Sequence, residues 1–391
     1  MASPRALTFS FLLSPSPFSF SPMSSLLLAP PAVRSKAPRA PRELSSKLAG
    51  FGLTIPGLLT SGAANAKLAK GEGLAFSSLL HLLPAKGLAR ALTPYSHSCN
   101  VRSELPGLRE LAIRFGLLER ALALNACAFS SEACRDLCLA FSGHGGISTN
   151  CASCRARRML AFLWDSEAFI KALLWSGGLA ARKARKLRLP FALRLNGTQE
   201  LPWHERSMSA RLSPEEARGL SRLYGSPIPS GRVTIPEALR GAKGVHLYDY
   251  AKAPLARLLA MREAGIHTTA SLAADSPGGV LRALEASQHG FAVAVPVLLA
   301  KGEPLPGELM LTAKGGGLAR LDCIDGDLND LRMLDRAPRA GFSGLAVLLR
   351  LKRSRGSKPE SAKAFALAPH ADWQELAGGG LARFSSLGEC S

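Results

Sequence analysis

The sequence lacks several features that would identify common classes of protein. After the first forty residues it has no run of eighteen or more uncharged apolar residues, so we expect no transmembrane helix and no membrane partner. The glycine-rich stretch AKGGGLAR (313–320) lacks the Walker spacing and a following Ser or Thr, so it predicts no ATP site. In PWHE (202–205) His204 and Glu205 are adjacent, and no P-C-x-x-C follows, which excludes a zinc deaminase.

Acidic residues are absent from the beginning of the chain, where Glu43 is the first. Residues 1–45 are rich in Ser, Pro and Arg, a composition that fits an organelle transit peptide or a disordered extension. Prolines interrupt the apolar stretches there and argue against a secretory signal, so we expect a cytoplasmic protein, with organelle transit as the alternative. Residues 46–100 are mostly Ala, Gly, Leu and Ser, and predict a linker without a recognisable domain.

Negative charge is scarce in the whole chain, which has 49 Lys and Arg against 29 Asp and Glu, a formal net charge of +20. Such an excess favours contact with nucleic acid or with acidic small molecules. Basic runs at 182–188 and 350–355 contribute to it. Nucleic acid is therefore one candidate partner, and a small or nucleic-acid-derived substrate is the other.

Helix and strand patterns alternate after residue 155. The apolar spacing predicts helices over 157–186, 213–225, 253–265 and 276–290, and strands over 189–196, 244–250, 266–273, 291–299 and 343–352. Strands separated by single helices imply a mainly parallel sheet. We predict one α/β domain over 101–355, with a barrel-like (β/α) arrangement that need not be complete. It would contain a cysteine segment at 127–154, and residues 356–391 would form a C-terminal tail.

Polar residues gather where three predicted strands end: Arg194, Asn196 and Glu200; Asp249, Tyr250 and Lys252; His267, Thr269 and Ser271. In parallel α/β architectures ligands bind at the carboxyl ends of the strands. Helix caps also need Asn, Asp and Ser, so one such residue proves little. Polar residues at several successive strands together predict a ligand-binding site.

The segment DCIDGDLNDLRMLD (322–335) concentrates five aspartates in a basic protein: Asp322, Asp325, Asp327, Asp330 and Asp335. Carboxylates this dense need a metal, a substrate amine or arginines such as Arg332 nearby. The glycine and closing glutamate of an EF-hand are misplaced. Either the segment is an Asp-Gly turn with capping aspartates, or Asp325, Asp327, Asp330 and Arg332 face Asn196, Glu200, Asp249 and the cysteines across one pocket.

Several motifs together resemble a family of bacteriophage-encoded proteins, a domain of unknown function with no assigned activity. The family pattern is CPxASxGCxxxCL, RLNGTSD, FYDYTK, YHLTFS and DGDxxDLRFLD. This chain has CAFSSEACRDLCL (127–139), RLNGTQE (194–200), LYDYAK (247–252), IHTTAS (266–271) and DGDLNDLRMLD (325–335), in the same order. It departs from the pattern at Ala128, at Gln199-Glu200 and at Ala251, and the resemblance does not cover residues before about 100.

The three cysteines that match the family pattern are Cys127, Cys134 and Cys138. Three thiolates can hold an iron-sulfur cluster with one open iron, although the usual spacing for that chemistry is C-x3-C-x2-C. Zinc is the rival, with Cys151, Cys154, His144 or Cys99 completing a four-ligand site. Buried thiols without a metal are the third alternative.

We therefore predict a phage-type (β/α) enzyme that contains a metal or an iron-sulfur cluster and has a polar site at the strand ends. The candidate catalytic residues are Asn196, Glu200, Asp249, Lys252, His267, Asp325, Asp327, Asp330 and Arg332, and the candidate metal or cluster ligands are Cys127, Cys134 and Cys138. A nucleic-acid-binding accessory protein with structural zinc is the alternative function. A decayed copy without activity is a third.

Overall fold

The computed structural model describes residues 37–62, 69–71, 73–84, 87–92, 107–138, 140, 148–300, 302–313, 316–352, 357–369, 372–377 and 379–385. The chain divides into residues 1–36, which lie outside this description, and a compact unit from residue 37 onward. Most of the predicted N-terminal extension (1–45) therefore lies outside the described residues. Helix α1 (Arg42–Ala49) begins within its last positions.

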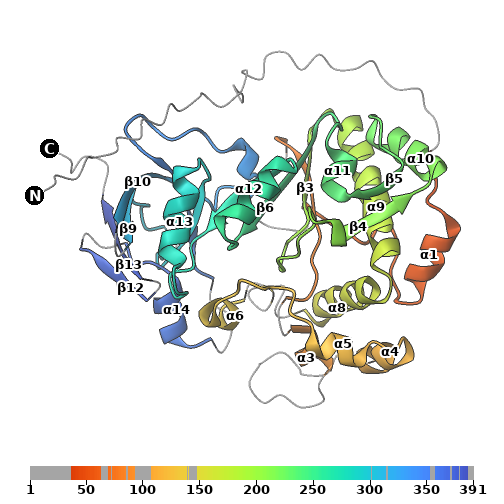
Figure 1. The fold of residues 1–391 in the computed structure, drawn as a ribbon, viewed down its shortest axis with the longest axis horizontal. Helices are drawn as coiled ribbons and strands as arrows, with labels where there is room; N and C mark the ends of the chain where they lie inside the picture. Colours follow the sequence, from red (N-terminus) through yellow and green to blue (C-terminus); the bar gives the residue numbers. More distant parts are fainter. Residues whose placement is uncertain are drawn as a thin grey trace, which may run out of the picture. The chain divides into compact units, whose positions relative to one another are not determined.

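An eleven-stranded sheet forms the centre of this unit, in the order β1-β2-β3-β6-β7-β8-β11-β10-β9-β13-β12 (Figure 1). Its strands are β1 (Thr60–Ser61), β2 (Phe76–Leu79), β3 (Phe191–Arg194), β6 (Val245–Ala251), β7 (Ile266–Ser271), β8 (Val293–Val297), β11 (Gly344–Arg350), β10 (Gly316–Asp325), β9 (Glu308–Ala313), β13 (Gly380–Ser385) and β12 (Gln374–Leu376). Neighbours from β2 to β10 are all parallel. The pairs β1–β2, β9–β10, β9–β13 and β12–β13 are antiparallel.

The prediction of an α/β fold with a mainly parallel sheet is confirmed. The described strands form an open row that ends at β1 and β12, and they do not close into a barrel. The barrel-like form of the prediction is therefore not what these strands make: they form an open sheet, because its outer strands pair antiparallel at both ends. Outside this sheet, β4 (Ser209–Leu212) and β5 (Gly231–Thr234) pair as a separate antiparallel hairpin.

Helices connect and cover the strands. They are α1, α3 (Gly87–Leu92), α4 (Leu108–Arg114), α5 (Leu118–Ala123), α6 (Glu132–Asp136), α8 (Thr149–Trp164), α9 (Ser166–Lys186), α10 (Pro214–Tyr224), α11 (Ile235–Leu239), α12 (Leu255–Glu263), α13 (Gly279–Gln288) and α14 (Pro359–Phe365), with the 3-10 turns η3 (Arg206–Met208) and η4 (Arg332–Leu334). The helix predicted over 157–186 is two helices, because Asp165 leaves the helical conformation and its side chain caps α9 through the Ala168 amide. Ser213 caps α10 in a reciprocal capping box with Glu216.

The two faces of the parallel sheet are covered differently. Helices α9, α12 and α13 pack on one face, where alternate strand residues such as Leu193, Leu247 and Val295 are buried. The other face is covered by the segment around η4, where Leu331 packs with Tyr248. The acidic segment predicted at 322–335 thus runs from β10 across the sheet toward β6 and β7.

The sheet extends beyond the predicted domain limits of 101–355. Strands β1 and β2 come from the stretch predicted as a linker (46–100), and β12 and β13 come from the stretch predicted as a tail (356–391). Strand β2 is only four residues long, FSSL, yet both of its serines are buried beside β3. Such a short polar strand carries no alternating pattern, and its neighbours bury it.

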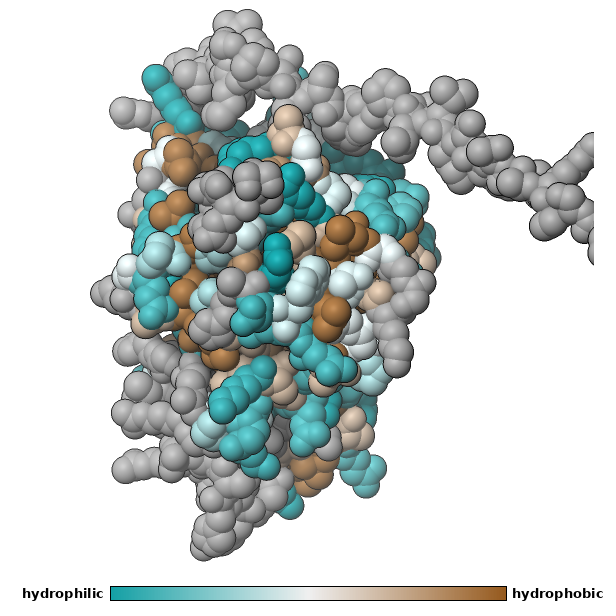
Figure 2. Space-filling model, turned by 90° about the vertical axis from the view of Figure 1, so that its left-hand side faces the viewer, coloured by the Kyte–Doolittle hydropathy of each residue, from teal (hydrophilic) through white to brown (hydrophobic). Residues whose placement is uncertain are grey.

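Figure 2 shows the side of the molecule that lies at the left of Figure 1, where β12, β13 and β10 are found. Apolar residues on this side are interspersed with polar ones. Leu318 of β10, Trp373 and Leu381 of β13 are among the exposed large apolar residues of the unit. Single exposed apolar residues of this kind are ordinary on protein surfaces. No helix in the described part of the chain is long and apolar enough to cross a membrane.

Candidate functional site at the carboxyl edge of the sheet

The segment RLNGTQE (194–200) begins at the last residue of β3. Its loop forms hydrogen bonds to the residues that follow β2. The Gly197 amide donates to the Leu80 carbonyl at 2.9 Å, and Thr198 Oγ1 donates to the Leu82 carbonyl at 2.6 Å. The Leu82 amide donates to Gln199 Oε1 at 3.1 Å. Position 197 requires glycine, since a Cβ atom there would lie 2.6 Å from the Leu80 carbonyl oxygen. Parallel pairing of β2 with β3 thus fixes the loop at the carboxyl edge.

Asn196 holds the inner turn of this loop. Its Oδ1 accepts hydrogen bonds from the Leu201 amide and from Trp203 Nε1, each at 2.9 Å. Its side chain also hydrogen-bonds to Asp249. Asn196 is buried, so most of its hydrogen-bonding capacity is used within the protein.

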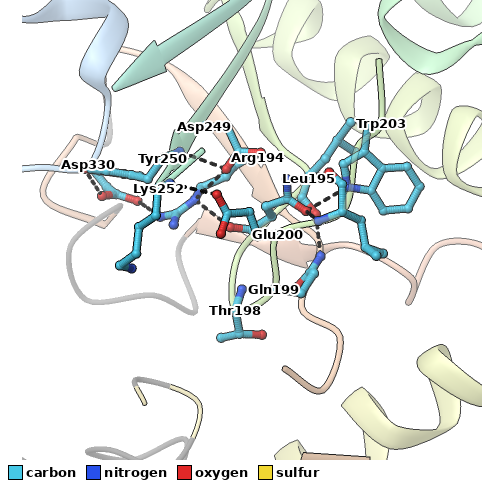
Figure 3. Close-up of polar contacts among 12 residues, drawn as sticks. Arg194, Leu195, Thr198, Gln199, Glu200, Trp203, Asp249, Tyr250, Lys252 and Asp330 are labelled. Carbon is cyan, nitrogen blue, oxygen red and sulfur yellow. Dashed lines mark hydrogen bonds and ion pairs between the residues drawn. The ribbon is translucent and has the colours of Figure 1, made fainter. Parts of the chain in front are cut away.

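Arg194 connects the end of β3 to the acidic segment (Figure 3). Its Nη1 donates to Asp330 Oδ2 at 2.9 Å, and its guanidinium lies 4.5 Å from the centre of the Tyr250 ring. The Tyr250 hydroxyl donates to the other oxygen of Asp330 at 2.9 Å. Both carboxylate oxygens of Asp330 therefore accept hydrogen bonds. Asp330 connects the acidic segment to Arg194 of β3 and to Tyr250 of β6.

Asp249 of β6 is a buried carboxyl at the same edge of the sheet. Burial raises the pKa of Asp249 to about 7, although Arg194 Nε at 3.7 Å and the Tyr250 amide at 2.9 Å favour its charged form. The carboxyl of Glu200 also disfavours that charge. Burial likewise raises the pKa of Glu200, whose Oε1 accepts from the Lys252 amide at 2.7 Å. Two neighbouring carboxyls with raised pKa values are typical of reactive sites.

The ammonium group of Lys252 joins the carboxyls to the cysteine segment. It hydrogen-bonds to Cys134, and the charges of Cys134, Glu200 and Cys127 raise its pKa against the effect of burial. The cysteine segment has a second contact through α6, whose Ala133 amide donates to Asp275 Oδ2 at 3.2 Å. Burial raises the pKa of the Cys138 thiol to about 11. Lys252 thus has carboxylate and thiol neighbours together.

Other predicted site residues lie apart from this group. Asp325 and Asp327 form ion pairs with Arg350 at the ends of β10 and β11. His267 is the second residue of β7, and its ring hydrogen-bonds to the backbone of Arg332. Arg332 itself is buried and pairs with Asp335 at 3.2 Å. Within the acidic segment, Asp330 forms an ion pair with Arg194 at the end of β3.

A comparison with protein families identifies the family of this chain. A family model described as Gene product 88 matches residues 64–364, which is more than half of the chain and includes every strand from β2 to β11. The chain belongs to the Gene product 88 family. This confirms the resemblance to a bacteriophage-encoded family of unknown function, while the individual motifs are not tested by the match. No curated protein and no solved structure matches the chain.

The metal sites predicted for this Gene product 88 chain are not tested by the structure. Its described residues contain no group of three or more His, Cys, Asp or Glu side chains placed to hold a metal ion. Cys127, Cys134 and Cys138 are all partly buried. Two residues predicted as further zinc ligands, Cys99 and His144, lie outside the described residues.

Sequence reasoning missed one basic side chain beside the site, His81. His81 follows β2, in the stretch that was predicted as a linker, so no pattern pointed to it. Arg155 and Arg158 belong to the basic run after Cys154, for which the sequence leaves two interpretations open: charges that offset a thiolate or a phosphate, or a solvated helix face. In the Gene product 88 fold α8 turns both of them toward the segment after β2.

Proposed function

We propose that this phage-type protein is an enzyme whose reaction takes place at the carboxyl edge of β3 and β6. The reacting groups are Glu200, Asp249 and Lys252. One observation carries the proposal: a carboxyl buried beside a second carboxyl, with a pKa of about 7. A group with such a pKa exchanges protons at neutral pH, as general acid–base catalysis requires.

The neighbouring groups support proton transfer at this edge. Asp249 is the general base when ionised and the general acid when protonated. Lys252 supplies a fixed positive charge for an anion that develops on the substrate. A cavity of about 10 Å³ lies beside Asp249 and is lined by Asn196, Trp203 and His204 among others, with room for about one water molecule.

The enzyme proposal is tested without knowing the substrate. Purified wild-type protein is incubated with a small-molecule extract, and compounds are followed by mass spectrometry. We expect at least one compound to be consumed by wild type and by Glu263→Gln, an exposed control on α12, at the same rate. Asp249→Asn and Glu200→Gln should slow its loss at least 100-fold, the scale of general acid–base catalysis. Equal consumption by Asp249→Asn would refute the proposal, as would no consumption at all.

The iron-sulfur cluster and the zinc site stay predictions for Cys127, Cys134 and Cys138. Lys252 lies beside Cys134 and Cys127, and its positive charge would offset the negative charge of sulfur ligands in such a centre. Protein purified without oxygen should contain about four iron atoms, or about one zinc atom, per chain if this prediction holds. Cys134→Ala should then lose the metal, and Cys323→Ala should keep it, because Cys323 lies on β10. Metal-free wild-type protein would contradict both predictions.

Nucleic-acid binding is the second candidate function, favoured by the basic run 182–188. Lys183, Arg185 and Lys186 are exposed on the last turns of α9, which leads into the start of β3. That position is the amino edge of the parallel sheet, opposite the polar site. The triple variant Lys183→Gln, Arg185→Gln, Lys186→Gln should then weaken binding to a DNA or RNA duplex and reduce its salt dependence. Unchanged binding would reject this surface.

A further inference from the structure

Arg155 and Arg158 lie three positions apart on α8 and therefore on one side of that helix. Arg158 is only 8% exposed. Its Nη2 donates to the Gly57 carbonyl at 2.7 Å and its Nη1 to the His81 carbonyl at 3.4 Å, whereas its buried Nε has no hydrogen-bond partner. Arg155 Nη1 donates to the Ala140 carbonyl at 2.8 Å.

No described carboxylate balances the charge of this pair of arginines. Among the described residues, no carboxylate forms an ion pair with Arg155 or Arg158, and their hydrogen-bond acceptors are neutral carbonyls. Burying a cation without a counter-ion is costly, and native proteins avoid it. Arg194, in contrast, is paired with Asp330 at 2.9 Å.

His81 completes the group from the side of the sheet. Its ring packs against Gly197, and its buried Nδ1 has no hydrogen-bond partner. Burial lowers the pKa of His81 to about 3, and the charges of Arg155, Arg194 and Arg158 contribute to this shift. The hydrogen bond from Arg158 to the His81 carbonyl places this arginine beside the segment that holds the loop RLNGTQE, and Arg155 lies one turn away on the same side of α8.

We propose that Arg155, Arg158 and His81 form a subsite for an oxyanion, the phosphate or carboxylate group of the substrate. Its role as a substrate contact rests on the proposed enzyme function. Guanidinium groups match the planar or tetrahedral oxygens of carboxylate and phosphate, and a bound oxyanion supplies the missing negative charge. It also places the anionic end of the substrate beside the loop that carries Glu200.

The test measures binding alone and needs no turnover. The melting temperature of the full chain is measured with 10 mM inorganic phosphate, with acetate, and with chloride at equal ionic strength. We expect one of the two oxyanions to raise it by roughly 2 °C over chloride. Arg155→Gln should lose this shift, and Arg218→Gln, an exposed arginine on α10, should keep it.

The choice of oxyanion tells the two sources apart: a shift with phosphate indicates a phosphorylated substrate, and a shift with acetate alone indicates a carboxylic acid. The imidazole NMR resonance of His81 in wild type, assigned by its absence in His81→Gln, should shift when the same anion is added. This second measurement keeps the test decisive if Arg155→Gln folds poorly. No shift over chloride, or an equal shift in Arg155→Gln, would overturn the subsite. Oxyanion binding without consumption of any compound would reject the enzyme and leave the subsite standing.

Discussion

Two buried aspartates in the same sheet, Asp249 of β6 and Asp322 of β10, have opposite electrostatic surroundings. Both side chains are almost fully enclosed, so burial favours the neutral form of each. Asp322 nevertheless keeps a pKa well below its ordinary value, because Arg336 and Arg339 hydrogen-bond to its oxygens. Asp249 has one guanidinium nitrogen at 3.7 Å, and burial raises its pKa to about 7.

The difference lies in how the two carboxylates are paired with cations. The Arg339 amide and Arg339 Nε donate to Asp322 at 2.9 and 2.8 Å, so both of its oxygens are bound. Asp249 shares its one cation with Asp330, which binds that cation more closely. The number and distance of cations, and not burial itself, decide which aspartate exchanges a proton at neutral pH.

The largest expected effect comes from Asp322→Asn. The change leaves Arg336 and Arg339 without their carboxylate, and we expect the free energy of unfolding at pH 7 to fall by about 3 kcal/mol. A depressed pKa contributes stability above the unfolded value, near 3.8, and this is lost as the pH falls through the folded value. The difference in the free energy of unfolding between wild type and variant, measured in urea, should therefore be smaller at pH 3 than at pH 7. A gap that stays constant would show that the ion pairs do not stabilise the fold.

Asp249→Asn should act in the opposite direction on stability. A raised pKa means that the folded chain holds a proton that the unfolded chain releases, so wild type loses stability as the pH rises from about 4 to about 7. The amide cannot ionise and avoids this loss. We expect the variant to be more stable than wild type at pH 8 by on the order of 2 kcal/mol, and to match it at pH 4.

Measurement of urea unfolding at these two pH values decides the second prediction, with Glu263→Gln as the control. Equal stability of Asp249→Asn and wild type at pH 8 would place the pKa of Asp249 near its ordinary value. The proposed acid–base role of Asp249 would then lose its support.

Much of the parallel core follows from the sequence. Residues 244–250 and 266–273 are short apolar runs, each followed by a helix pattern, and they form β6 and β7. Helix boundaries were less accurate. The Ser-Pro pair at 276–277 predicted the start of α13, but this helix begins at Gly279, which approaches the Ala273 carbonyl too closely for any Cβ. Contacts from distant parts of the chain decide such details, and local patterns do not contain them.

The site was partly predictable for a geometric reason. Parallel strands bring their carboxyl ends to one edge, and this rule correctly brought Asn196, Glu200, Asp249 and Lys252 together. The roles of these residues stay predictions. His81 could not be foreseen, because β2 has no strand pattern, and the pairing of Asp325 with Arg350 depends on the register of β10 and β11.

Tyr250→Phe tests how strongly the Tyr250 hydroxyl contributes to holding Asp330 in place. The change removes the hydroxyl that donates to Asp330 Oδ1, while Arg194 still binds the other oxygen. We expect a loss of about 1.5 kcal/mol in the free energy of unfolding, the value of a buried hydrogen bond to a charged group. Unfolding in urea at pH 7 measures it. A loss below the error of the method would show that Arg194 alone holds Asp330.

The smallest expected effect comes from Arg336→Gln, which removes one of the two cations around Asp322. Arg336 is 47% exposed, so solvent already weakens its attraction, and Arg339 keeps both a side-chain and an amide contact with the carboxylate. We expect a loss of about 0.5 kcal/mol at pH 7. Asp322 should remain ionised, so the acid-induced loss of stability below pH 4 should persist in the variant, which urea unfolding at pH 7 and pH 3 detects. Should Arg336→Gln instead abolish that loss, the pKa of Asp322 would depend on a single cation, as that of Asp249 does, and the contrast between the two aspartates would rest on Arg336 alone.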